Sequence, residues 1–265
     1  MNKTVNKTPV NEFSPALWNE IEKTIREAAA KHEGPRIAAF DADGTLWDAD
    51  AGETFFDWQI QNCPLPAFKD LDPWTHYHDL KKPDPRVGYV WLAQINAGFS
   101  LQQVRDWAET CFSENAKRFG SWPVFASQKK LVDLLRTLDF EVYVVTASVK
   151  WAVEPVAKLV GIDFDHVIGI ETEVNNGLVT DIVKPPITWR DGKADGLLAK
   201  TQGVRPILAA GNTYGDIALL QCATHVRLAL STQDTAGGLF DEENKLVEHA
   251  TQEKWHVHPF RTRKS

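Results

Sequence analysis

The chain has 265 residues, 43% of them hydrophobic, which is enough for one large domain or for a core domain with an inserted subdomain. Its formal charge of -7 and pI near 5.6 argue against nucleic acid or an anionic membrane surface as partners, because both attract basic proteins. A phosphate site in such a chain must be made locally positive by a metal ion, a lysine or backbone N–H groups.

The first predicted element is a helix. Ser14 followed by Pro15 is typical of an N-cap with proline at the first helical position, and apolar residues then recur at helical spacing as far as Gly34. The apolar run 36–40 predicts a short buried strand. This strand ends abruptly in the polar turn 41–45.

Strands and helices are then expected to alternate. Apolar runs predict strands at 141–146, 167–170, 206–210 and 226–230. Helical patterns lie between several of them, at 128–138, 149–160, 194–200 and 216–222. This order predicts an α/β fold with a Rossmann-like parallel sheet and helices on both faces. Ligands gather at the carboxyl ends of the strands in such sheets.

Residues 52–124 break the alternation, because they are rich in tryptophan, proline and helical patterns. We predict a helical cap here, inserted after the first strand between the core segments 1–51 and 125–265. Ser100 is the expected N-cap of one cap helix. Prolines that are expected to lie in the preceding loops are Pro64, Pro66, Pro73, Pro83 and Pro85. Beyond the cap, Asn175-Asn176-Gly177 predicts a hairpin turn.

Two carboxylates follow the first predicted strand. Asp41 and Asp43 are separated by one residue, so one can attack phosphorus while the other donates a proton and later accepts one. Gly44 lets the backbone turn tightly beside them. A polar turn or a cation-binding loop is the alternative for this pattern on its own.

The next strand ends in Thr146, whose hydroxyl, with the backbone N–H groups that follow, suits phosphate oxygens. Ser148 is more simply explained as an N-cap of the next helix. Lys193, in the first turn of a predicted helix, can neutralise a nucleophilic carboxylate and a phosphate together. Lys184 is the second choice, because the two prolines after it favour an extended loop.

A later strand ends in a glycine turn with two oxygen-bearing side chains, Asn212 and Asp216. Such oxygens suit a hard cation such as Mg²⁺. Asp216 is also a candidate N-cap for the helix that follows.

Together these four segments, spread over residues 36–222, resemble the haloacid dehalogenase superfamily. Thr146-Ala147-Ser148, followed by Trp151 and Glu154-Pro155, is similar to its phosphoserine-phosphatase-like branch. The resemblance implies a Mg²⁺-dependent phosphomonoester hydrolase (phosphatase) that forms an aspartyl-phosphate. Haloacid dehalogenation is disfavoured, since it has no use for Asp43 or for magnesium.

The resemblance also implies roles for single residues. Asp41 would be the nucleophile and Asp43 the general acid/base, while Thr146 and Lys193 would grasp the phosphoryl group. The implied magnesium ligands are Asp41, the Asp43 backbone carbonyl, Asn212 and Asp216. Further implied substrate contacts are Thr45, Glu53, Ala147 and Ser148. Asn212 stands where the family usually has aspartate, so we expect weaker metal binding with activity retained.

The substrate is expected to be a small phosphorylated metabolite. Asp48, Asp50 and Glu53 follow the first motif, where this branch often places a carboxylate that meets a substrate amino group. Aromatic residues near them in the sequence are Trp47, Phe55, Phe56, Trp58, Trp74, Tyr77, Tyr89 and Trp91. These rings either hold a cationic group or, as we favour, form the core of the cap. The resulting hypothesis is phosphoserine or a phosphorylated amino alcohol.

Other features indicate little chemistry. Widely spaced Cys63, Cys111 and Cys222 favour reduced, buried thiols and a cytoplasmic location. The first ten residues show no signal peptide, and no stretch reaches the roughly 20 apolar residues that cross a membrane. The pairs His76/His78 and His256/His258 lack further zinc ligands nearby and are expected in loops or on the surface. Arg261, Arg263 and Lys264 are expected to form a frayed tail.

Two alternatives remain open at this level. One is a low-activity protein that binds a phosphorylated ligand or a partner, with Asn212 as its symptom. The other is a phosphotransferase or mutase, which would pass the phosphoryl group from Asp41 to an acceptor other than water. The residues do not indicate the oligomeric state.

Overall fold

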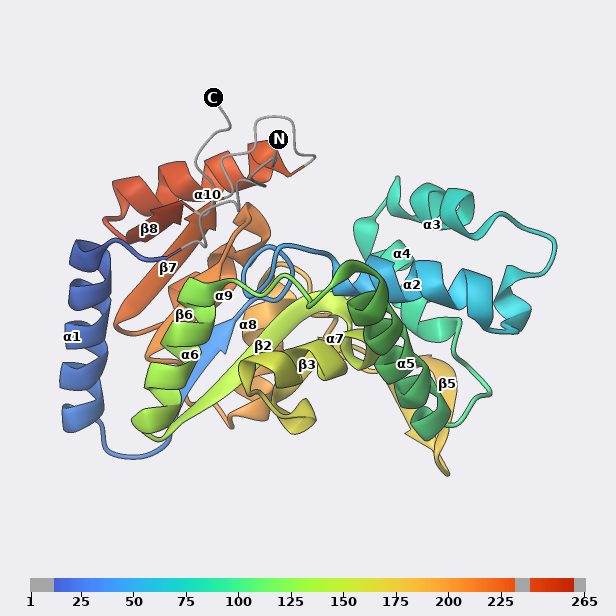
Figure 1. The fold of residues 1–265 in the computed structure, drawn as a ribbon, viewed down its shortest axis with the longest axis horizontal. Coiled ribbons are helices and arrows are strands. Elements are labelled where there is room, and N and C mark those ends of the chain that lie inside the picture. Colours follow the sequence, from blue (N-terminus) through green and yellow to red (C-terminus); the bar gives the residue numbers. More distant parts are fainter. Residues whose placement is uncertain (1–11, 232–238, 260–265) are drawn as a thin grey trace, which may run out of the picture.

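The computed structural model describes residues 12–231 and 239–259 (Figure 1). At its centre lies a six-stranded sheet in the order β3-β2-β1-β6-β7-β8, in which every neighbouring pair is parallel. The strands are β1 (Arg36–Phe40), β2 (Phe140–Val149), β3 (Val167–Ile170), β6 (Leu208–Gly211), β7 (Val226–Ser231) and β8 (His256–Pro259). The predicted parallel sheet is thus confirmed.

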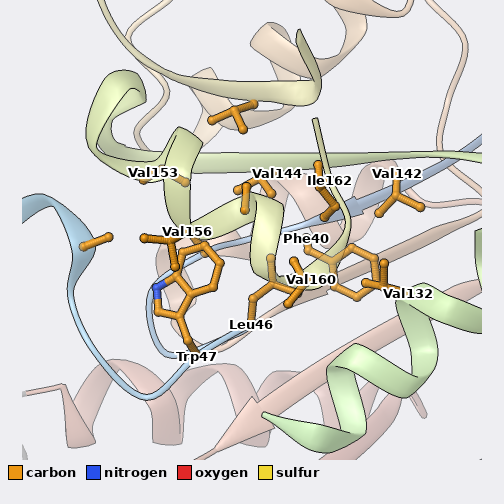
Figure 2. Close-up of a cluster of buried hydrophobic side chains, with 14 of the residues drawn as sticks. Phe40, Leu46, Trp47, Val132, Val142, Val144, Val153, Val156, Val160 and Ile162 are labelled. Carbon is orange, nitrogen blue, oxygen red and sulfur yellow. The ribbon is translucent and has the colours of Figure 1, made fainter. Parts of the chain in front are cut away.

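Helices cover both faces of this sheet, as the α/β prediction requires. One face packs against α1 (Pro15–Lys31), α6 (Ala126–Thr137) and α7 (Lys150–Ala157), and the other against α8 (Asp191–Lys200), α9 (Ile217–Cys222) and α10 (Phe240–Gln252). Alternate strand residues serve the two faces: Phe40 and Val144 point into the cluster drawn in Figure 2, whereas Ala39 and Val145 point to the opposite side. Both faces are therefore buried.

The strand order places a ligand crevice between β1 and β6. From β1 the chain proceeds outward to β2 and β3, then returns to lay β6 on the other side of β1. Such a reversal of direction leaves a gap outside the carboxyl ends of the two central strands. Residues that follow β1 and β6 therefore meet at this point.

Between β1 and β2 the chain forms a group of helices, which lies at one end of the molecule in Figure 1. These are α2 (Ala51–Asn62), the 3-10 turn η1 (Pro66–Phe68), α3 (Pro73–Lys81), α4 (Pro85–Gln94) and α5 (Leu101–Phe119). The chain enters and leaves this group side by side, because Asp48 N donates to Pro123 O and Phe125 N donates to Leu46 O, each at 2.9 Å.

The predicted hairpin forms β4 (Thr172–Asn175) and β5 (Leu178–Val183), and it packs beside the helical group. Gly98 N donates to Val179 O at 2.9 Å, and Leu101 N donates to Gly177 O at 2.9 Å. Further 3-10 turns are η2 (Lys158–Val160), η3 (Phe164–His166) and η4 (Tyr214–Asp216).

The sequence predicted some helix starts correctly and others wrongly. Ser14 and Ser100 cap α1 and α5 as expected, through their hydroxyl groups. The loop assignment of Pro73 and Pro85 is wrong, because each begins a helix behind an aspartate cap. Proline is tolerated there, since the first helical N–H has no partner within the helix. Pro66 similarly begins η1.

Of the four paired histidines, His78 lies on the surface as expected, whereas His258 does not. His76 and His78 lie in α3, and His256 and His258 lie in β8. His258 is only 3% exposed, and burial lowers its pKa to about 4. The strand escaped prediction because it is short and is defined by its pairing with β7. The three basic residues near the C-terminus, Arg261, Arg263 and Lys264, lie outside the described residues.

All three cysteines are free thiols; Cys111 and Cys222 are buried as expected, whereas Cys63 is half-buried. In the part of the chain that the structure describes, no helix combines the length and the apolar character needed to cross a membrane.

Candidate active site

A cavity of about 360 Å³ lies at the carboxyl end of the sheet, between the central strands and helices α2 to α4. It brings together most of the residues that the sequence selected: Asp41, Asp43, Glu53, Thr146, Ala147, Ser148, Lys193 and Asn212. Thr45 and Asp216 are fully buried and do not line the cavity. We call the end of the cavity at Asp41 the sheet end, and the end at Glu53 the helical end.

Asp41 and Lys193 form a buried ion pair at the sheet end. Lys193 Nζ donates to Asp41 Oδ1 at 2.6 Å and also contacts Asp216 Oδ1. Burial, followed by the charge of Asp216, raises the pKa of Asp41 to about 7, and Lys193 opposes this shift. Burial by itself would lower the pKa of Lys193, but the charges of Asp216 and Asp41 raise it. Lys193 is therefore a fixed ammonium beside the carboxylate.

Asp43 is held by three donors. Trp47 Nε1 and Ala51 N donate to its Oδ1 at 2.7 and 2.8 Å, and Ser148 Oγ donates to its Oδ2 at 2.7 Å. Burial raises the pKa of Asp43, although these hydrogen bonds partly offset the effect. The carboxyl group is therefore held in one orientation. It also keeps its proton to a higher pH than an aspartic acid in water does.

Two of these donors differ from the sequence interpretation. The N-cap assignment of Ser148 is wrong, because Ser148 lies in β2 and α7 begins later, at Lys150, without a side-chain cap. Trp47 was grouped with the cap aromatics, yet its ring is buried in the core beneath the sheet end (Figure 2). No sequence signal separates an orienting tryptophan from a core one.

The two threonines differ in position. Thr146 lines the cavity, and its Oγ1 accepts a hydrogen bond from Ser148 N at 3.0 Å. Thr45 Oγ1 donates to Asp41 Oδ2 at 3.0 Å from beneath. Thr45 therefore orients Asp41 and does not face the space that a ligand would fill.

Asn212, after β6, approaches the turn after β1 closely. Its amide Nδ2 is placed by hydrogen bonding to three oxygens: Asp41 Oδ2 at 3.1 Å, Thr45 Oγ1 at 3.1 Å and Asp43 O at 3.3 Å. Gly44 permits this approach, because its φ is +77° and a Cβ there would lie 2.2 Å from the other amide atom of Asn212, which is Oδ1 in this orientation. A side chain at this position would push the two loops apart.

The donor set fits a hard cation. The Asp41 carboxylate, the Asp43 backbone carbonyl and the Asn212 amide converge here. Mg²⁺ prefers oxygen ligands, so Asn212 would hold it through Oδ1 after a half-turn of the amide. No cluster of three or more His, Cys, Asp or Glu side chains suited to a metal occurs among residues 12–231 and 239–259, so a cation would depend on the carbonyl and the amide.

Asp216 supports the site from below. Its Oδ2 accepts from Asn212 N, Thr213 N and Thr213 Oγ1 at 3.0 to 3.2 Å, and its Oδ1 contacts Lys193. The prediction that its side chain caps the following helix is wrong, because Asp216 makes no side-chain cap of α9. It instead forms a capping box with Thr213 at the 3-10 turn η4.

The helical end of the cavity is acidic and aromatic. Asp50 caps α2 by accepting from Glu53 N at 2.7 Å, and both carboxylates line the cavity with Tyr77 and Tyr89. Asp50 as a whole residue is exposed, but its carboxyl group is buried by the surrounding protein. This burial and the charges of Asp43 and Glu53 raise the pKa of Asp50 well above its ordinary value. We call these four residues the acidic–aromatic recess.

Most other aromatic side chains of the helical group between β1 and β2 pack on one another, with Phe56 central to the cluster. Its ring centroid lies 4.8 to 6.0 Å from those of Phe68, Trp74, Tyr77 and Trp91. Sequence reasoning missed several further residues that line the cavity, among them Lys81, Leu92, Trp189 and Arg190. Lys184 lies on the exposed surface, where it pairs with Glu171 at 3.0 Å.

Comparisons with known proteins agree with this architecture. The chain is 24% identical to a phosphorylcholine phosphatase of Pseudomonas aeruginosa, over 66% of this chain and 68% of that protein. A functionally unknown protein from Anaerococcus prevotii has a similar structure, with a TM-score of 0.68, 14% identity and coverage of 94% of this chain and 93% of that one. A phosphoserine phosphohydrolase-like protein from Francisella tularensis gives a TM-score of 0.50 and 16% identity, with coverage of 84% and 94%.

The family assignment rests on a family model. The model described as haloacid dehalogenase-like hydrolase matches residues 38–221, which include Asp41, Thr146, Lys193 and Asp216. This match confirms the resemblance seen in the sequence and the prediction of a hydrolase. The chain belongs to the haloacid dehalogenase-like hydrolase family.

Proposed function

We propose that this protein is a Mg²⁺-dependent phosphomonoester hydrolase that works through an aspartyl-phosphate at Asp41. The observation that carries the proposal is a buried carboxylate with an ammonium 2.6 Å away, beside a second carboxyl group with a raised pKa, all in one cavity. This set contains a nucleophile, a charge-neutralising group and a proton donor.

The proposed reaction has two steps. An Asp41 carboxylate oxygen attacks phosphorus, the bond to the ester oxygen breaks, and Asp43 gives its proton to that oxygen. Asp43 then takes a proton from water, whose oxygen attacks the phosphorus of the aspartyl-phosphate. The bond between phosphorus and the Asp41 oxygen breaks, inorganic phosphate leaves, and both carboxyl groups return to their starting states.

Other residues hold the phosphoryl group and the cation. Lys193 offsets the negative charge of Asp41 and of the phosphoryl oxygens, and Thr146 with the backbone N–H of Ala147 contacts these oxygens. The Ser148 N–H, which donates to Thr146 Oγ1, holds that hydroxyl in place. Magnesium would be held by Asp41, the Asp43 carbonyl and Asn212, and it supplies positive charge to the phosphoryl oxygens. Asp216 contributes indirectly, since its oxygens contact Lys193 and the Asn212–Thr213 backbone.

We propose that residues 52–124 form the cap over a core of residues 1–51 and 125–265, and that the cap supplies the substrate contacts. The substrate would be a small phosphorylated metabolite with an ammonium group, such as phosphoserine or a phosphorylated amino alcohol. The acidic–aromatic recess, which includes Glu53, supports this choice of substrate. The similarity to a phosphorylcholine phosphatase supports it as well. The free thiols support a cytoplasmic location.

Turnover of p-nitrophenyl phosphate tests the reaction. Hydrolysis should require Mg²⁺ after treatment with EDTA and should vanish in Asp41→Asn, whereas Asp195→Asn, on the exposed side of α8, should leave it unchanged. Turnover that survives either the chelator or the Asp41 change would contradict the proposal. Binding of phosphate esters without turnover would instead favour the low-activity binding protein, which the uncharged Asn212 supports.

A panel of esters tests the substrate. Phosphoserine, phosphoethanolamine and phosphorylcholine should be hydrolysed with higher kcat/KM than glycerol phosphate or sugar phosphates. Equal or better turnover of the esters without an ammonium group would contradict the hypothesis of an ammonium-bearing substrate. Transfer of phosphate to an added alcohol, measured against released inorganic phosphate, separates the hydrolase from a phosphotransferase.

A further inference from the structure

Lys81, the last residue of α3, places its ammonium in the acidic–aromatic recess. Nζ lies 3.7 Å from Glu53 Oε1 and donates to Tyr77 Oη at 3.3 Å. It also lies 4.6 and 5.2 Å from the ring centroids of Tyr77 and Tyr89. A carboxylate and two aromatic rings are the usual surroundings of a bound ammonium group.

The rest of the side chain is accommodated by Gly88 of α4. A Cβ at Gly88 would lie 2.5 Å from Lys81 Cγ, so the stem occupies space that only glycine leaves open. The neighbouring Lys82 differs, because its side chain is 75% exposed and pairs with Asp79 on the surface. Lys81, at 26% exposed, is therefore packed into the recess.

We infer that Lys81 is a tethered cation that occupies the recess in the free protein and competes with the ammonium group of a substrate. This inference rests on the proposed function. Lys81 can vacate the recess, because its stem is long, flexible and partly exposed, so its head can turn to solvent. Its presence raises the KM for phosphate esters that carry an ammonium group. The KM for esters that lack this group is unaffected. Lys81 is thus a specificity-determining residue.

The kinetic test uses Lys81→Met, with Lys82→Met as the matched control. We expect the KM for phosphorylcholine to fall about fivefold in Lys81→Met, with kcat unchanged, and the KM for glycerol 2-phosphate to stay within about twofold. Lys82→Met should alter neither. An unchanged or increased KM for phosphorylcholine would overturn the inference, and an increase would show that Lys81 assists the binding of substrate.

A second variant displaces the lysine while keeping its charge. In Gly88→Ala the added methyl group presses on the Lys81 stem, so the KM for phosphorylcholine should fall in the same direction as in Lys81→Met. Adding Glu53→Gln to Lys81→Met should abolish most of the gain, because the recess then lacks its paired carboxylate. A gain that persists without Glu53 would place the competition elsewhere.

Binding of choline chloride, measured by calorimetry, separates this inference from the proposed function. Choline carries the ammonium without phosphate, so no turnover is needed. Lys81→Met should bind it about fivefold more tightly than the unmodified protein. If p-nitrophenyl phosphate is not hydrolysed but this difference is found, the proposed function fails, while the occupation of the recess by Lys81 in competition with an ammonium ligand stands. Equal affinities would overturn the inference.

Discussion

The two ends of the cavity are built differently. At the sheet end, Asp41, Lys193 and Asn212 are each less than 10% exposed, and their polar atoms lie within hydrogen-bond distance of one another. At the helical end, the Glu53 and Lys81 side chains are 37% and 26% exposed and 3.7 Å apart. Buried charges require fixed partners, whereas half-exposed charges can exchange them. The sheet end therefore suits chemistry, and the helical end suits recognition.

The largest effect should come from breaking the sheet end. Lys193→Met leaves Asp41 without its neutralising ammonium, and kcat for p-nitrophenyl phosphate should fall about 100- to 1,000-fold. Lys184→Met, which removes an exposed lysine outside the cavity, should leave kcat unchanged. A loss of similar size in both variants would refute the distinction between them.

The next effect concerns how the helical group is fixed to the core. Arg105 of α5 forms a two-point ion pair with Glu154 of α7 at 2.7 and 2.9 Å, and Glu154 is 3% exposed. Arg105→Met leaves this carboxylate buried without its partner, so urea unfolding should show a loss of about 2 kcal/mol. Lys158→Met breaks the exposed pair with Glu109 and should cost less than about 0.5 kcal/mol. Equal losses in the free energy of unfolding would show that the buried ion pair stabilises the protein no more than the exposed pair does.

A smaller effect should come from loosening one donor to Asp43. Trp47→Phe removes the 2.7 Å hydrogen bond while keeping an aromatic ring, and kcat should fall about tenfold with KM unchanged. The control, Trp58→Phe, removes a similar bond to Glu114 outside this cavity. A change in KM alone would mean that Trp47 serves binding and not the orientation of Asp43.

The smallest effect is expected at the helical end. Glu53→Gln weakens the hold on a substrate ammonium but also on Lys81, so the two losses partly cancel. The KM for phosphorylcholine should rise about two- to threefold, with kcat for p-nitrophenyl phosphate unchanged. Glu109→Gln, at an exposed position in the middle of α5 and outside the cavity, serves as the control. A large fall in kcat would show that the two ends are not separable.

Much of the sheet end could be predicted from the sequence. Buried strands of a parallel sheet read as uninterrupted apolar runs, and polar residues just after them must lie at one edge. Asp41, Thr146 and Asn212 were found in this way. Lys193 was singled out only by the surrounding pattern, because a lone lysine in a helix carries no signal of its own.

The helical end could not be read in the same way. Lys81 looks like any lysine at a helix end, and Gly88 like any small helical residue, until α3 and α4 are packed together. Trp47 and Ser148 were assigned other roles for the same reason, since a core ring or a strand-end hydroxyl is distinguished only by the atom it reaches. The edge strand β8 lacks a clear apolar pattern, so its existence depends on β7.

The order of apolar runs and polar turns by itself determined the α/β class and the residues at the carboxyl edge of the sheet, because periodicity and chain order are local properties. Only the tertiary structure decided how closely each ammonium group approaches its carboxylate. It brought Lys193 to Asp41 and Lys81 to Glu53 across 152 and 28 residues of chain. Charge pairing acts over a few ångströms in space, and sequence distance does not encode it.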